Sequence, residues 1–171
     1  MRFSRFIFGV TVVTTALISQ SLFAQANDSQ NFTVVVGDAL SITAPADVLI
    51  NHNLADSNQP FSQQSWNVYT SNALGASVSM SMGRFVHDSD STFFRNASMD
   101  LAVLSSDATA TWAVDSASDS TNATGTATVA ASSSGPGSGA LGLSVVFIET
   151  DASTLASGNY VATVTGTITN N

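Results

Sequence analysis

A strict alternation of apolar and small polar side chains is the feature that most constrains the fold of this chain. From Ala76 to Met82, apolar residues occupy the even positions and serines occupy the odd ones. Only an extended strand separates such residues onto two opposite faces, because successive side chains of a strand point to opposite sides of a sheet. The segment therefore predicts a strand with one buried apolar face and one hydroxyl-bearing face in water.

The same period recurs along most of the chain. Near the end, Tyr160, Ala162, Val164 and Ile168 alternate with threonines, which are β-branched and polar and therefore suit the outer face of a sheet. Shorter sets with this period are Phe32, Val34 and Val36; Leu40 and Ile42; Val48 and Ile50; Trp66 and Val68; Met99, Leu101 and Val103; and Trp112 and Val114. The continuous apolar run from Leu141 to Ile148 is typical of a central strand covered on both faces.

Turn residues such as Gly37-Asp38 and Ser157-Gly158-Asn159 separate these segments, and no stretch has a helical period. The pattern predicts an all-β fold, an antiparallel, immunoglobulin-like β-sandwich of roughly 9–11 strands. Irregular spacing and long loops favour two packed sheets over one closed sheet. The phase of Trp66 and Trp112 with their neighbouring valines places both indoles in the core.

The first 26 residues have the pattern of a secretory signal peptide. Arg2 and Arg5 precede an uncharged apolar run from Phe6 to Phe23, and Ala24-Gln25-Ala26 is a small-x-small cleavage site. We therefore expect residues 1–26 to be removed and residues 27–171 to form a single exported domain, located extracellularly, on the cell surface or in the periplasm. A membrane anchor is the alternative for this run, but its threonines, serine and glutamine make it a weak one.

Charge excludes several classes of protein. The chain has no lysine and no cysteine, and residues 27–171 carry two arginines against twelve acidic residues, a formal charge of −10. Nucleic-acid binding needs a basic face, and disulfide scaffolds or Cys-ligated zinc sites need cysteine. No segment after residue 26 is long and apolar enough to span a membrane.

Two stretches interrupt the strand pattern. Leu54 to Gln64 is a polar loop in which Phe61 is the expected anchor. Residues 116–139 are low in complexity, and we expect an edge strand within Thr124 to Val129, with mobile flanks because such small side chains bury little apolar surface.

Catalytic chemistry finds little support in the sequence. His52 and His87 both stand in polar contexts that favour surface positions, and the G-x-S-x-G nucleophile pattern is absent. Glu149 and Asp151 form a carboxylate pair at the end of an apolar strand, where we expect both to meet solvent. We predict a non-enzymatic protein with no catalytic residues and no cofactor.

Three weaker binding features remain. Asp88 and Asp90 lie in an acidic loop with oxygen ligands that calcium prefers, although the spacing of a calcium-binding EF-hand loop is missing. Tyr69 falls on the face opposite Trp66, and Phe94 is one of two adjacent rings that point to opposite faces. Tyr69 and Phe94 are thus candidate exposed contacts for a ligand such as a carbohydrate.

The order of segments resembles bacterial fimbrial and pilus-type surface subunits. The resemblance rests on Asn31-Phe32-Thr33-Val34-Val35-Val36, on Trp66 to Asn72 (WNVYTSN) and on Gly158 to Thr165 (GNYVATVT), in which a Gly-x-Tyr turn leads into a closing strand. The cysteine pair common in chaperone-usher subunits and a penultimate aromatic residue are missing. The resemblance implies an immunoglobulin-like sandwich whose amino-terminal strand adds to the sheet edge of a neighbour.

We therefore expect a secreted structural or surface protein, a fimbrial-like subunit or adhesin whose partners are itself or other surface subunits. In this hypothesis Phe32, Val34 and Val36 form the strand-addition segment, and the alternative is that they pair within their own domain. The second hypothesis is an extracellular binding module for carbohydrate or calcium.

Overall fold

The structure is a computed structural model that describes residues 28–171. The expected signal peptide, residues 1–26, lies outside the described residues. Residues 36–171 form one compact unit, and the residues before it belong to a separate segment of the chain.

The predicted all-β, antiparallel fold is confirmed for the described part of the chain. It contains one short 3₁₀-helix, η1 (Ala152–Thr154), and no helix able to cross a membrane. The strands are β1 (Leu40–Thr43), β2 (Gln59–Pro60), β3 (Gln64–Thr70), β4 (Ala76–Gly83), β5 (Phe85–His87), β6 (Phe94–Arg95), β7 (Ala97–Ser106), β8 (Ala113–Ser116), β9 (Ser118–Ser120), β10 (Thr126–Ser132), β11 (Gly137–Phe147), β12 (Tyr160–Val161) and β13 (Val164–Asn170). Their number exceeds the prediction because several are fragments of two or three residues.

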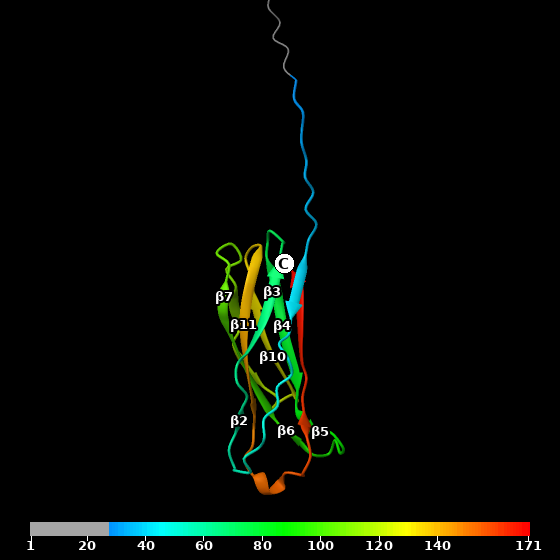
Figure 1. The fold of residues 1–171 in the computed structure, drawn as a ribbon, viewed down its shortest axis with the longest axis vertical. Helices are drawn as coiled ribbons and strands as arrows, with labels where there is room; N and C mark the ends of the chain where they lie inside the picture. The colour runs from blue at the N-terminus through cyan, green and yellow to red at the C-terminus, as the bar shows by residue number, and fades with distance from the viewer. Residues whose placement is uncertain (1–27) are drawn as a thin grey trace, which may run out of the picture. The chain divides into compact units, whose positions relative to one another are not determined.

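The strands form three antiparallel sheets (Figure 1). Sheet A has the order β1-β3-β11-β7-β9, and β2 pairs with the far end of β11. Sheet B has the order β13-β4-β10-β8, and sheet C the order β12-β5-β6. Because β5 follows β4 and β12 precedes β13 after short breaks, sheet C continues sheet B toward the lower end of Figure 1.

The core lies between sheet A and sheet B, and the alternating residues supply it as predicted. Met80 and Val78 of β4 face Leu141 and Met99 of sheet A, and all four are fully or almost fully buried. Trp66 and Trp112 are both in the core. The run from Leu141 forms β11, which is a central strand of sheet A.

Three predictions about local structure are wrong. Residues 28–39 and 44–58 contain no strand, so the alternating sets at Phe32 to Val36 and at Val48 to Ile50 have no partner in the described chain. The low-complexity stretch is built into the sheets, and β10 is an inner strand rather than an edge. Its small residues pack well because Ala127, Val129 and Ala131 fit beneath the larger side chains of β4 and sheet A.

The alternation of β4 gives a direct test of the core. We expect Met80→Ala to lower the free energy of unfolding by about 2–5 kcal/mol, because it leaves a cavity between the sheets. Ser79→Ala, one residue away on the outer face, should change it by less than about 0.5 kcal/mol. Urea denaturation of the two variants measures the difference, and equal losses would contradict the assigned faces.

Candidate functional site

The two sheets are open on the same side of the domain. β1 is the edge strand of sheet A, but it pairs only with Asn67 to Thr70, so the first half of β3 has no partner on that side among the described residues. On the facing side, β12 and β13 are the edge strands of sheets C and B. Backbone N–H and C=O groups on one side of each edge therefore have no strand partner, and such edges readily pair with another chain.

Glycine explains why the opening is confined to one end. A Cβ atom at Gly166 of β13 would lie 2.8 Å from both Ile42 Cδ1 and Trp66 Cζ3, so the absence of a side chain lets β13 approach β1 and β3. After Thr43, the last residue of β1, the chain leaves sheet A at Ala44-Pro45 and continues without regular structure. The open edge of sheet A and the β12–β13 edge therefore separate where β1 ends.

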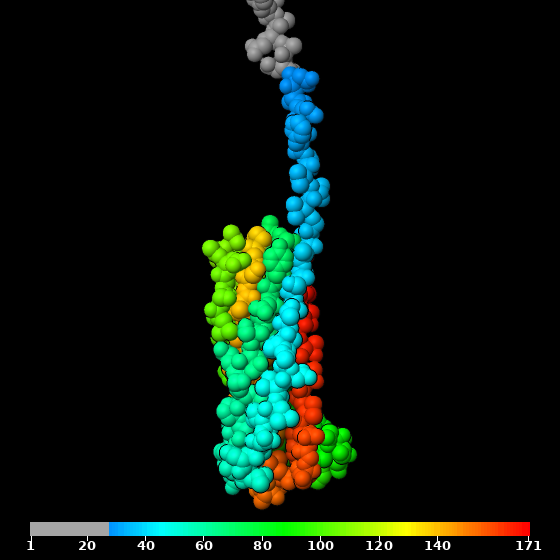
Figure 2. All heavy atoms as spheres, viewed as in Figure 1, coloured from blue at the N-terminus to red at the C-terminus, as the bar shows by residue number. Residues whose placement is uncertain are grey.

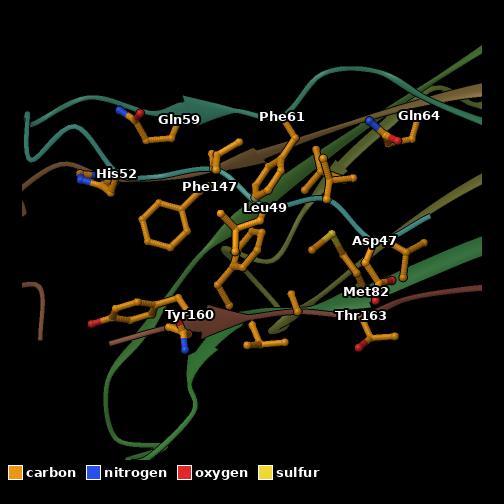
Figure 3. A pocket seen from close by; sticks show the side chains of 18 of the residues that line it. Asp47, Leu49, His52, Gln59, Phe61, Gln64, Met82, Phe147, Tyr160 and Thr163 are labelled. Atoms are coloured by element: carbon orange, nitrogen blue, oxygen red, sulfur yellow. The ribbon is translucent and has the colours of Figure 1, made fainter. Parts of the chain in front are cut away.

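The opening is an apolar groove of about 870 Å³. Figure 3 shows its walls, with Phe61 and Phe147 on the side of sheet A and Met82 and Tyr160 on the side of sheets B and C. The rings of Phe85 and Phe147 lie 5.2 Å apart and those of Phe147 and Tyr160 lie 5.7 Å apart, which makes an aromatic floor. Few ionisable groups line the groove, so it suits apolar side chains.

Residues 44–52 of the chain occupy this opening only loosely. In Figure 2 the cyan atoms that follow β1 lie between the teal atoms of β2 and β3 and the red atoms of β13. This stretch forms no strand, and its apolar residues remain accessible, Leu49 being 79% exposed. It lines the groove without completing either sheet.

The inner face of the β12–β13 edge is correspondingly incomplete. Tyr160, Ala162, Val164 and Ile168 pack against the core but are only partly buried, whereas the equivalent residues of the inner strands β4 and β10 are almost fully buried. One further strand beside this edge would cover them.

The separate amino-terminal segment has the opposite property. Phe32 is 86%, Val34 88% and Val36 79% exposed, and none of them belongs to a strand. Large apolar side chains exposed in succession, with period-two spacing, make this segment a candidate for strand pairing.

An ion pair between a buried carboxylate and a partly buried arginine holds the lower end of the groove. Glu149 is 3% exposed, which corrects the expectation that it meets solvent. Arg95 Nε donates to Glu149 Oε2 at 2.6 Å, and Arg95 Nη2 donates to Thr154 Oγ1 at 2.6 Å. Asp151 N donates to Glu149 Oε1 at 2.7 Å. These bonds hold the loop that precedes Tyr160, a role in positioning rather than in acid–base chemistry.

The histidines are also less exposed than predicted. His87 is 8% exposed, its Nε2 lies 3.1 Å from the Ser157 carbonyl oxygen, and its Nδ1 accepts from Ser89 N at 3.2 Å. His52 is half-buried against Phe147 and accepts from Leu54 N through Nδ1 at 2.9 Å. Both imidazoles shape loops beside the groove, and neither contacts a candidate nucleophile among the described residues.

The two carboxylates of the acidic loop, Asp88 and Asp90, already accept hydrogen bonds from neighbouring residues. Hydrogen bonds from the Asn159 amide and the Ser89 hydroxyl lower the pKa of Asp88, and those from the Thr92 hydroxyl and backbone N–H lower the pKa of Asp90. Within residues 28–171 no group of three His, Asp or Glu side chains converges as a metal site would require.

The two candidate ligand contacts are not brought together. Tyr69 is exposed on β3 of sheet A, whereas Phe94 is on β6 of sheet C. The Arg84 guanidinium lies 4.7 Å from the centre of the Phe94 ring, so one face of this ring already has a cation–π partner.

Sequence reasoning did not identify Phe61, Phe147 and Met82 as site residues, although they line the groove. Apolar residues of this kind usually belong to the core of a protein, so their sequence pattern does not distinguish a groove from the core.

Comparisons with protein-family models, with curated proteins and with solved structures give no match to this chain.

The ion pair predicts how stability depends on pH. Burial raises the pKa of Glu149, but the hydrogen bonds from Asp151 N–H and Arg95 outweigh it, so the pKa lies below its ordinary value of about 4.5. Its contribution is therefore complete above pH 4.5 and is lost as the pH falls through the folded-state pKa. Glu149→Gln should lower the free energy of unfolding at pH 7 by about 1.5–3 kcal/mol, the range for hydrogen bonds to a charged group, and flatten its acid slope.

Urea denaturation across an acidic pH series measures this slope. Asp100→Asn, a matched amide substitution at an exposed carboxylate, is the control and should leave the slope close to that of the parent protein. A parent slope retained by Glu149→Gln would contradict the assigned role.

Proposed function

We propose that this protein is an exported, non-enzymatic surface subunit that assembles by strand addition. In this assembly the segment Asn31–Val36 of one copy enters the groove between β1–β3 and β12–β13 of the next copy. The observation that carries the proposal is that one chain contains both an unpaired alternating segment and an apolar groove between two open sheet edges.

The dimensions of the two parts agree. Phe32 to Val36 comprises five residues, and five residues, Tyr160 to Val164, line the groove along the open edge. In an extended segment Phe32, Val34 and Val36 point to one face and enter the groove, while Thr33 and Val35 point to solvent. Burying one phenylalanine and two valines contributes about 5–9 kcal/mol, and the new backbone hydrogen bonds satisfy both edges.

Insertion into the same domain is disfavoured by chain length. Val36 is joined to Leu40, the first residue of β1, by four Cα–Cα steps, which span at most about 14 Å when extended. To lie beside Tyr160–Val164, the segment would have to pass all four residues of β1, about 13 Å, which leaves almost no length for the reversal of direction. The segment Asn31–Val36 of a second copy can fill the groove while β1 stays paired with β3.

The charge of the chain is compatible with this mode of association. Both arginines of residues 28–171 are already engaged, Arg84 with Phe94 and Arg95 with Glu149. The surface therefore offers few cations for ion pairs between acidic copies. Apolar contact and backbone pairing remain as the attractive terms, and both are non-ionic.

The alternation supplies a matched pair of variants. We expect Val34→Asp to abolish assembly, because it places a carboxylate in the apolar groove, a burial that costs several kcal/mol. Val35→Asp adds the same charge to the solvent-facing side and should still assemble. Light scattering after size-exclusion chromatography of the exported protein distinguishes polymers from monomers.

A peptide of residues 28–37 provides the complementary test. It should bind the monomeric Val34→Asp protein and raise its melting temperature, whereas the same peptide with aspartate at position 34 should not. Equal assembly of Val34→Asp and Val35→Asp would overturn the proposal, as would a parent protein that is monomeric at all concentrations.

A further inference from the structure

Residues 44–52, which we name the strap, cross the groove without pairing with either of its walls. Figure 3 shows the strap passing between Phe61, on the side of sheet A, and Tyr160 of sheet C. No backbone hydrogen bond joins residues 44–51 to any other residue that the structure describes. The strap therefore lies where an added strand would lie, but it leaves the backbone groups of both edges unpaired.

Both ends of the strap are anchored. It begins directly after β1, which pairs with β3. At the other end, the His52 ring lies 5.7 Å from the Phe147 ring, and His52 Nδ1 accepts from Leu54 N at 2.9 Å. The following turn is bonded to the lower loop, where Asp56 Oδ1 accepts from Ala152 N at 2.8 Å. The strap is thus an unbonded segment between two fixed points.

The strap continues the alternation of β1. Ile42 of β1 packs against the core, and every even position from there to Ile50 is alanine, valine or isoleucine. Val48 is 43% and Ile50 37% exposed, whereas Leu49 between them is 79% exposed. The even-numbered side chains therefore form an apolar face that covers the groove in part.

Pro45 explains why this alternation does not continue as a strand. Ser71 N donates to Ala39 O at 2.9 Å, so hydrogen-bonded pairs recur at every second residue along β1 and β3. The next such pair after the end of β1 would join residue 45 to Ser65, but proline has no N–H to donate. The ladder ends there, and the strap is left with side-chain contacts alone.

We infer that the strap is a displaceable cover of the groove and that it competes with the segment Asn31–Val36 of a second copy. This inference rests on the proposed function and adds a control on assembly. A donor segment binds only those copies whose strap has moved aside, so its apparent affinity falls as the covered fraction rises. Pro45 keeps the cover weak enough for a donor to displace it.

Three variants alter the cover without changing the donor segment. Val48→Ser with Ile50→Ser removes the apolar contacts of the strap, and Leu49→Ser, at the exposed position between them, is the matched control. Pro45→Val acts in the opposite direction, because it restores the N–H that lets β1 extend along β3. All three are made in the Val34→Asp protein, which we expect to be monomeric.

Association of the peptide of residues 28–37 measures the competition. Its rate constant should rise about tenfold when Val48 and Ile50 are both serine, because two partly buried apolar side chains no longer hold the strap in place. The rate constant should stay unchanged for Leu49→Ser and should fall for Pro45→Val.

An uncharged dye reports on the cover without the donor. Nile red emits strongly in apolar surroundings, so its emission should rise when the double serine variant uncovers the aromatic floor, and it should not change for Leu49→Ser. If strand addition itself is wrong, no variant binds the peptide, while the dye emission of the double variant still rises. That result would contradict the competition and support the cover.

Peptide association that is unchanged or slower in the double serine variant would overturn the inference, because the strap would then be part of the binding surface. Equal acceleration by Leu49→Ser would also overturn it, and so would unchanged dye emission. If the double variant fails to fold by its melting curve, Pro45→Val carries the test, and a rate constant that does not fall would overturn the inference.

Discussion

The unpaired backbone along β12 and β13 is the constraint on which the rest of the account depends. A sheet edge presents a row of donors and acceptors, and soluble proteins normally cover or charge such an edge. Here the chain leaves sheet A after Thr43 and passes the edge as an irregular segment, so neither sheet is completed. Tyr160, Ala162 and Val164 on the inner face of this edge remain only partly buried for the same reason.

In the proposed assembly, the amino-terminal segment supplies the strand that this edge lacks. Its three alternating apolar residues are exposed, and the linker to β1 leaves almost no length for the segment to turn back beside Tyr160. In the proposed assembly, each copy donates one apolar strand and offers one groove, which is the condition for head-to-tail growth rather than for closed pairs. The buried pair of Arg95 and Glu149 holds the loop at the lower end of the groove and so keeps its shape.

Much of the fold was predictable because period-two alternation reports directly on strand faces. β4, β7, β11 and β13 fell where the alternation indicated, and both tryptophans are buried as their phase required. The predictions that were wrong concern residues whose structure depends on contacts with segments distant in sequence. Phe32 to Val36 has the alternation of a strand but no strand partner among residues 28–171, and Glu149 is buried because Arg95, distant in sequence, pairs with it. The groove itself was not predictable, since its aromatic residues have the sequence pattern of an ordinary core.

Hydrogen exchange measured by mass spectrometry tests the central claim most directly, because it needs no assumption about register. Amides of Asn31–Val36 and of Tyr160–Val164 should exchange rapidly in the monomeric Val34→Asp protein. In the assembled parent protein both segments should become protected together, while the β8 and β9 edges at the other side of the sheets should not change. Assembly that leaves Tyr160–Val164 unprotected, or that protects β8 and β9 instead, would contradict the account.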